Sequence, residues 1–156
     1  MELTRDYKEF IELLKRHEVN YLIVGGYAVN LYGYPRYTDD LDIWIWVDSS
    51  NIRKLLVALK EFGFNSLNLS EEDFNSPENV LQLGYAPNRI DLLVEIEGLK
   101  FEACFDRRTI VELDQIQIDF IGLDDLIEAK KNTGRLQDLA DADQLEKLKR
   151  KHQNKA

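Results

Sequence analysis

The segment that most restricts how this chain can fold is residues 41–47, which read Leu-Asp-Ile-Trp-Ile-Trp-Val. Such a run of β-branched and aromatic residues predicts a β-strand. Side chains two residues apart in a strand point to the same side, so Asp40 and Asp42 are predicted to project together where the strand begins. The alternate apolar residues are predicted to pack into the core: Leu41, Ile43, Ile45 and Val47. The fold must therefore bury one side of this strand while the other side carries two carboxylates.

Two carboxylates held side by side repel each other, and each raises the pKa of the other. A cation between them removes that cost, and magnesium prefers hard oxygen ligands of this kind. The Asp-x-Asp pattern is common, however, and on its own it favours two solvated surface carboxylates over a metal site.

Asp91 lies in the segment 89–94, Arg-Ile-Asp-Leu-Leu-Val, which is apolar on both sides and predicts a strand inside the sheet. A lone aspartate in such a strand costs free energy unless another group pairs with it. Because neighbouring strands lie about 4.8 Å apart, Asp91 is predicted to join Asp40 and Asp42 around one or two metal ions. The alternative is that Asp91 caps a local turn after Asn88.

Gly25 and Gly26 end the apolar run 21–24, which predicts a buried strand that enters a tight turn and a short helix. Bare backbone N–H groups at such a turn allow an anion to approach closely. Arg36 lies between the glycines and the Asp-x-Asp strand, where its guanidinium can meet a phosphate. Four tyrosines of this region either stack on a base or pack locally: Tyr27, Tyr32, Tyr34 and Tyr37.

The rest of the chain predicts an amphipathic helix from Thr4 and a second one near residues 52–59, after a serine pair suited to capping. Residues 65–78 are polar and irregular. Further strands are predicted at 80–85, 89–96, 109–113 and 116–121, and helices from 123 onward with a break near 133–134. We find no repeat or linker and expect one domain over residues 1–156, with a core of about 1–121 and C-terminal helices of about 123–152.

Composition limits the possible partners. The formal net charge is −9, which argues against a large nucleic-acid footprint, since such a surface needs clustered cations. Cys104 is the only cysteine, so no internal disulfide is possible; we expect a core residue and a cytoplasmic protein. We recognise neither a secretory signal nor an apolar stretch long enough to cross a bilayer, and expect no membrane association.

These motifs resemble the DNA-polymerase-beta-like nucleotidyltransferases. The matching segments are 24–28, 33–43 and 90–92. The pattern Arg-x-Thr-x-Asp-hydrophobic-Asp, which starts at Arg36, is most similar to a branch that includes abortive-infection, toxin–antitoxin and antibiotic-modifying enzymes. Segments 123–130 and 135–141 resemble that branch's C-terminal Lys and Arg-x-x-Asp-x-x-Asp elements. The resemblance implies an α+β fold, with a mixed β-sheet of about four to six strands, flanking helices and a C-terminal helical pair.

The resemblance also implies an activity: transfer of a nucleoside monophosphate from a nucleoside triphosphate (NTP) to a hydroxyl acceptor, with release of pyrophosphate. Two Mg²⁺ ions, or Mn²⁺ in their place, are expected on Asp40, Asp42 and Asp91, and Asp91 is also expected to accept the acceptor's proton. The expected nucleotide-binding groups are Gly25, Gly26, Arg36 and Thr38. Lys130 falls on the inward stripe of its predicted helix, where it either extends past the core to solvent or reaches the triphosphate. A structural polar cluster is expected from Arg135, Asp138 and Asp141.

Two other readings stay open. The chain could be a non-catalytic nucleotide- or partner-binding member of a toxin–antitoxin or phage-defence pair. It could also be a metal-dependent phosphohydrolase or nuclease, although the diglycine argues against this because hydrolases need no triphosphate cradle. Within the transferase reading the acceptor is open between a drug-like molecule, a protein hydroxyl and an RNA end, with RNA least favoured by the charge. A protein partner or a second copy of the chain could complete the cleft.

Overall fold

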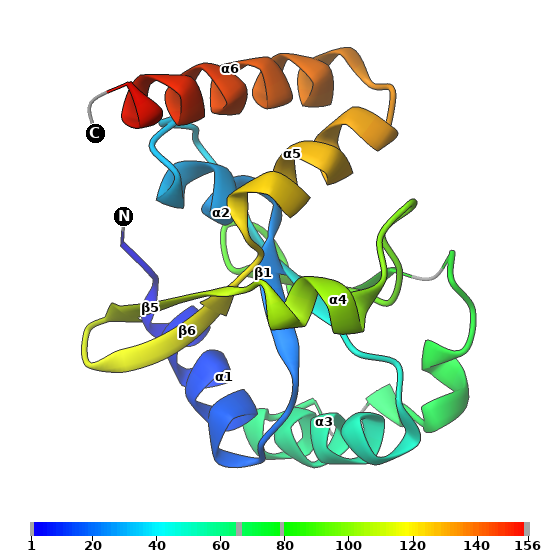
Figure 1. Ribbon diagram of the computed structural model, residues 1–156. Coiled ribbons are helices and arrows are strands. Elements are labelled where there is room, and N and C mark those ends of the chain that lie inside the picture. The colour runs from blue at the N-terminus through cyan, green and yellow to red at the C-terminus, as the bar shows by residue number, and fades with distance from the viewer. Residues whose placement is uncertain (1, 65–66, 79, 155–156) are drawn as a thin grey trace.

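The computed structural model describes residues 2–64, 67–78 and 80–154, and a mixed β-sheet runs through its middle (Figure 1). Within these residues the sheet has six strands: β1 (Tyr21–Val24), β2 (Asp40–Ile45), β3 (Val80–Leu83), β4 (Arg89–Leu93), β5 (Thr109–Leu113) and β6 (Ile116–Phe120). Their order is β3-β4-β2-β1-β6-β5. The pairs β1–β6 and β2–β4 are parallel, and the other three pairs are antiparallel.

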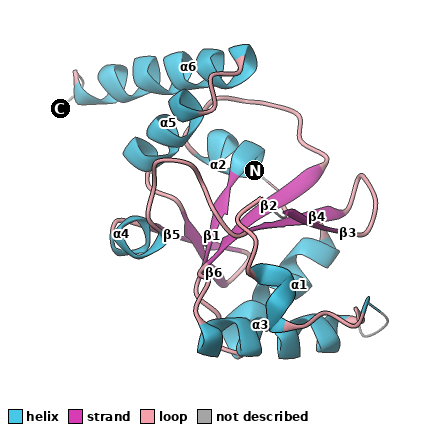
Figure 2. Cartoon of the chain, turned by 90° about the vertical axis from the view of Figure 1, so that its right-hand side faces the viewer, coloured by secondary structure: helices cyan, strands magenta, loops and turns pink. Residues whose placement is uncertain are grey.

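Helices cover the sheet from two sides. They are α1 (Arg5–Arg16), α2 (Gly25–Leu31), α3 (Ser49–Phe62), α4 (Phe101–Asp106), α5 (Leu123–Asn132), α6 (Leu136–Gln153) and the short 3-10 helix η2 (Glu71–Phe74). Figure 2 shows α1 and α3 on one side of the strands and α2, α5 and α6 on the other. This is the mixed sheet with flanking helices and a C-terminal helical pair that the family resemblance implied.

The core forms where the apolar faces of the helices pack against the sheet. The predicted stripe of α1 is fully buried: Tyr7, Phe10, Ile11 and Leu14. The helix begins after Thr4, whose hydroxyl accepts a hydrogen bond from the Tyr7 N–H at 3.2 Å. In β2 the residues Leu41, Ile43 and Ile45 are buried as predicted. The same prediction was wrong for Val47, which is 44% exposed because the strand ends at Ile45.

Two other local features differ from the sequence predictions. The cap of α3 is Asp48, whose carboxylate accepts from the Asn51 N–H at 3.1 Å, and not the serine pair. Helix α4 was not predicted because it has only six residues, too few for a clear helical period. It packs Phe101 edge-on against Trp44 of β2, with ring centroids 5.2 Å apart.

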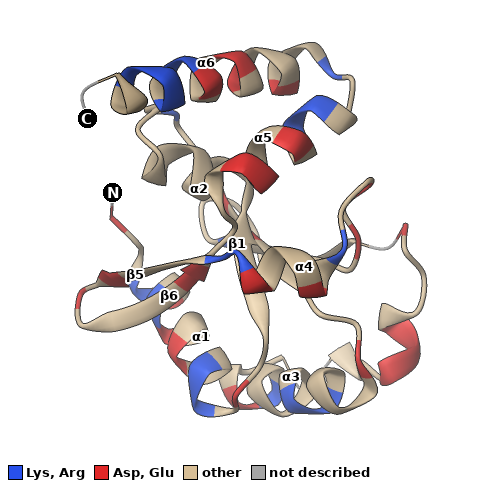
Figure 3. Cartoon of the chain, viewed as in Figure 1, with Lys and Arg blue, Asp and Glu red and all other residues tan. Residues whose placement is uncertain are grey.

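The two C-terminal helices meet at the predicted break, where Gly134 has a positive φ of 70°. Basic residues gather in the last turn of α6, as Figure 3 shows, and there they complement the helix dipole. No helix in the described part of the chain combines the length and apolar character needed to span a membrane.

Candidate active site

The sheet register brings three carboxylates together. β2 and β4 are parallel neighbours, and Asp42 of β2 lies directly opposite Asp91 of β4. Asp40 is on the same side of β2 as Asp42, because side chains alternate along a strand. One oxygen from each of the three carboxylates lies within 4.8 Å of the other two. The prediction that they converge is therefore confirmed, and we call Asp40, Asp42 and Asp91 the acidic triad.

Arg89 links two members of the acidic triad. Its Nη2 donates to Asp40 Oδ2 at 2.9 Å and to Asp91 Oδ2 at 3.1 Å, while its Nε donates to Asp91 Oδ1 at 2.9 Å. Arg89 was not among the site residues predicted from the sequence. Its position two residues before Asp91, on the same side of the same strand, was the signal that could have revealed it.

The hydrogen bonds of Arg89 go to Asp40 and Asp91 and not to Asp42. Burial, together with the neighbouring charges of Asp40 and Asp91, raises the pKa of Asp42 to about 7, although the charges of Lys130 and Arg89 offset part of the rise. Burial also raises the pKa of Asp91, although the hydrogen bonds from Arg89 oppose that rise. The acidic triad thus carries more negative charge than the neighbouring cations neutralise.

The diglycine approaches the acidic triad too closely for any side chain. Gly25 has a φ of +67°, and a Cβ atom on it would lie 2.1 Å from Asp42 Oδ2. A Cβ atom on Gly26 would lie 2.9 Å from the Thr38 side chain. The Thr38 hydroxyl donates to the backbone oxygen of Asp40 at 2.9 Å and lies 3.2 Å from its Oδ1. The glycines therefore let the start of α2 sit directly beside the carboxylates.

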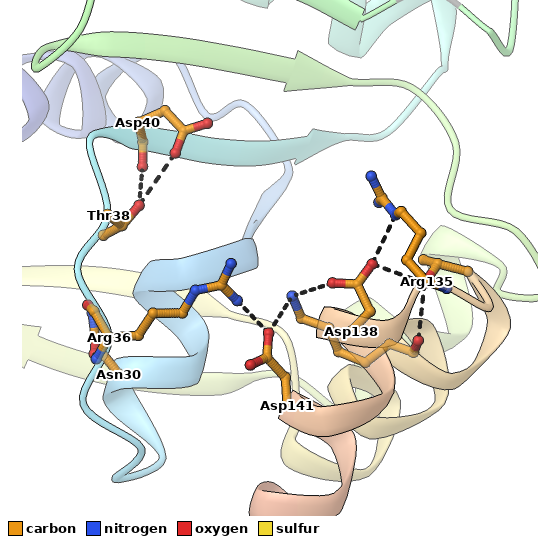
Figure 4. Close-up of polar contacts among 9 residues, drawn as sticks. Asn30, Arg36, Thr38, Asp40, Arg135, Asp138 and Asp141 are labelled. Carbon is orange, nitrogen blue, oxygen red and sulfur yellow. Dashed lines mark hydrogen bonds and ion pairs between the residues drawn. The ribbon is translucent and has the colours of Figure 1, made fainter.

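A polar cluster holds the C-terminal helices near the acidic triad (Figure 4). Lys130 Nζ lies 3.1 Å from Asp138 Oδ1 and 3.2 Å from Asp141 Oδ2. Arg36 forms an ion pair with Asp141, and Arg135 forms one with Asp138 at 2.9 Å. The Lys130 side chain is only 13% exposed, so it does not extend to solvent. The expected cluster of Arg135, Asp138 and Asp141 exists, and it includes both Lys130 and Arg36.

A polar pocket of about 310 Å³ lies between these groups. Residues of the acidic triad, the diglycine and the polar cluster line it: Gly25, Gly26, Arg36, Tyr37, Thr38, Asp39, Asp40, Asp42, Lys130, Arg135, Gln137 and Asp138. Tyr37 is 83% exposed at this pocket, whereas Tyr32 packs inward and donates to the Ile121 carbonyl at 2.6 Å. Every predicted site residue except Asp91 lines this pocket, and Asp91 adjoins it through the acidic triad.

Solved structures with the same fold belong to nucleotidyltransferase-like proteins. A candidate nucleotidyltransferase from Thermotoga maritima matches with a TM-score of 0.61 and 18% sequence identity, over 97% of this chain and 92% of that one. An antigenic nucleotidyltransferase-like protein from Paracoccidioides brasiliensis matches with a TM-score of 0.56 and 15% identity, over 92% of this chain and 74% of that one. No curated protein matches by sequence. The fold is thus that of the nucleotidyltransferase-like proteins.

The family described as "nucleotidyltransferase of unknown function" (DUF6036) matches residues 2–150, and the chain belongs to that family.

Proposed function

We propose that this chain is a metal-dependent nucleotidyltransferase, which moves a nucleoside monophosphate from an NTP to a hydroxyl acceptor and releases pyrophosphate. The observation that carries the proposal is the position of the acidic triad. Its carboxylates lie within 4.8 Å of one another, beside two glycines that border a polar pocket. Membership of a nucleotidyltransferase family supports the same reaction class.

The donor set fits a hard divalent cation. All three side chains offer carboxylate oxygens, the ligands that Mg²⁺ prefers, and the raised pKa of Asp42 marks a negative charge that lacks a partner. We propose Mg²⁺ as the natural metal, with two ions held by Asp40, Asp42 and Asp91, and Mn²⁺ as a substitute. When bound, the metal would neutralise charge on the carboxylates and on the triphosphate.

The triphosphate would bind in the polar pocket. Gly25 and Gly26 line this pocket and carry no side chain of their own, so their backbone N–H groups would bind phosphate oxygens. Lys130 has three N–H donors and uses two on the aspartates of α6, so the third is free for the triphosphate. Arg36 can likewise bind phosphate with the donors that its pair with Asp141 leaves over.

Asp91 would accept the proton of the acceptor hydroxyl while the hydroxyl oxygen attacks the α-phosphorus. A new O–P bond forms, the bond from the α-phosphorus to the bridging oxygen breaks, and pyrophosphate leaves. Arg89 would hold the Asp91 carboxylate in orientation through its two hydrogen bonds. Positioning and charge neutralisation around the phosphate would supply most of the rate.

Replacing Asp42 tests this function. We expect Asp42→Asn to lower transfer by about 100-fold or more, measured as pyrophosphate release and as α-phosphate label on small-molecule, protein and RNA fractions. Asp143→Asn is the matched control, because Asp143 is an exposed aspartate of α6 outside the polar pocket. Circular dichroism checks that both variants fold. Full activity in Asp42→Asn would contradict the assignment.

One observation favours a second candidate function. Arg89 binds both oxygens of Asp91, which lowers the capacity of that carboxylate to accept a proton. A chain that binds Mg²⁺ and NTP without catalysis would tolerate this arrangement. Nucleotide binding with no pyrophosphate release in any fraction would favour that role, and release of free phosphate alone would favour a phosphohydrolase.

A further inference from the structure

A second cavity, of about 420 Å³, adjoins the polar pocket at the acidic triad. It shares five lining residues with the polar pocket: Gly25, Asp42, Lys130, Arg135 and Asp138. It differs in two respects, because Asp91 lines this cavity and not the polar pocket, and because apolar side chains form most of its remaining wall. The proposed proton acceptor therefore lines an adjoining, largely apolar space.

The sheet register explains how polar and apolar groups are arranged in this cavity. Gln82, Asp91, Asp42 and Val24 are successive partners across β3, β4, β2 and β1, so they form one row on one side of the sheet. Val80 and Leu93 pair in the next row on that side. Same-side residues of a strand are about 7 Å apart. The apolar row of Val80 and Leu93 therefore begins about 7 Å along the strands from the row that contains Asp91.

Helix α5 supplies the facing wall. Leu126 and Ala129 line the cavity from this helix, and Ile96 lines it from the segment after β4. A molecule that occupies the cavity is thus held between an apolar row of the sheet and an apolar part of a helix, beside the carboxylates of Asp42 and Asp91. The volume falls in the range of about 300–1,000 Å³ typical of small-molecule sites.

The charges of the cavity argue against an anionic occupant. Three carboxylates line it, those of Asp42, Asp91 and Asp138. The two cations on its wall, Lys130 and Arg135, are both paired with Asp138. Phosphate groups of an RNA end would therefore compete with the triphosphate for Lys130 and would meet the carboxylate of Asp91, whereas an uncharged molecule does neither.

We propose that this cavity, here called the acceptor cavity, binds a neutral small molecule that carries its hydroxyl on a ring-sized apolar body. The inference rests on the proposed transferase function and names its acceptor class. The hydroxyl lies at Asp91, the apolar body lies against Leu93, Val80 and α5, and the triphosphate lies in the polar pocket. The hydroxyl oxygen bonds to the α-phosphorus, its proton goes to Asp91, and pyrophosphate leaves from the polar-pocket side.

The test uses 2-naphthol as the probe, because it is neutral and combines a hydroxyl with an apolar ring system. Saturation-transfer NMR measures its binding to the wild type and to Ala129→Phe, which places a large side chain in the acceptor cavity. Ala140→Phe is the matched control, because Ala140 is an exposed alanine of α6 that lines neither cavity. We expect Ala129→Phe to weaken probe binding at least about tenfold and Ala140→Phe to leave it unchanged.

Val80→Lys keeps the test decisive if Ala129→Phe does not fold. Val80 is 49% exposed on the edge strand β3, so the substitution is tolerated there and brings a charge to the apolar row. It is expected to weaken probe binding as Ala129→Phe does.

Three results would overturn the acceptor cavity. The first is that the wild type does not bind 2-naphthol, and the second is that Ala129→Phe and Val80→Lys bind it undiminished. The third is preferential binding of a short ribo-oligonucleotide that Ala129→Phe blocks. Binding of a non-hydrolysable ATP analogue with Mg²⁺ is measured on the same samples and should stay within about threefold in all variants. Absence of that binding in the wild type would count against the proposed function, separately from the probe result.

Discussion

Asp42→Asn is expected to stabilise the metal-free protein at alkaline pH, although it removes a residue of the proposed active site. Asp42 is buried beside Asp40 and Asp91, and its pKa is raised from the usual 3.8 to about 7. The folded state therefore binds a proton more tightly than the unfolded state does. Ionisation of Asp42 costs the folded protein free energy, and asparagine, which has nearly the same shape, removes that cost.

The sign and size of the effect follow from linkage. A raised acidic pKa means that folding stability falls as pH rises from about 4 to about 7, and levels off above that. Each tenfold change in proton affinity corresponds to about 1.4 kcal/mol, so the rise from 3.8 to about 7 sets an upper limit of about 4 kcal/mol. Solvent access and movement of Arg89 reduce this cost. We therefore expect Asp42→Asn to raise the free energy of unfolding by about 2 kcal/mol, which corresponds to about 4–8 °C in Tm.

Thermal unfolding in EDTA, at several pH values between 5 and 8, measures this gain. The stability difference between Asp42→Asn and the wild type should grow with pH and reach its full size near pH 8. Asp143→Asn is the control: it removes an exposed aspartate that pairs with Lys147, and it should change stability by less than about 0.5 kcal/mol at every pH. A variant that is no more stable than the wild type at pH 8 would refute the reasoning.

Three further predictions follow. Gly25→Ala should lower stability by about 1–2 kcal/mol, because of its positive φ, and should weaken Mn²⁺ binding in titration calorimetry, because its Cβ displaces Asp42. Lys130→Met should destabilise the protein by about 2 kcal/mol in urea unfolding, since Asp138 and Asp141, two buried aspartates of α6, both lose an ion pair. Arg89→Gln should lower Tm in EDTA at pH 8. Added Mg²⁺ should raise Tm by more in this variant than in the wild type, because the metal replaces the lost positive charge.

The sequence predicted those parts of the site that depend on one strand. The alternation in β2 placed Asp40 and Asp42 on one side, since that follows from strand geometry alone. The apolar surroundings of Asp91 predicted an interior strand. That this strand neighbours β2, with Asp91 opposite Asp42, could be expected only as a hypothesis, because strand order depends on the packing of the whole sheet.

Contacts between distant segments were not predictable in the same way. Arg36 and Asp141 are more than a hundred residues apart and meet only because α6 packs beside the loop before β2. The acceptor cavity likewise needs the row of Val80 and Leu93 to face α5, which no local pattern reveals. Val47 shows that the alternating pattern does not predict where a strand ends: the pattern continues to Val47, but β2 ends at Ile45 and Val47 is exposed.

A crystal structure of the protein with Mn²⁺ and a non-hydrolysable NTP analogue tests the central claim most directly. We expect anomalous density for manganese in contact with Asp40, Asp42 and Asp91, and the triphosphate against the backbone of Gly25 and Gly26. Manganese away from the acidic triad, or a triphosphate bound outside the polar pocket, would contradict the account.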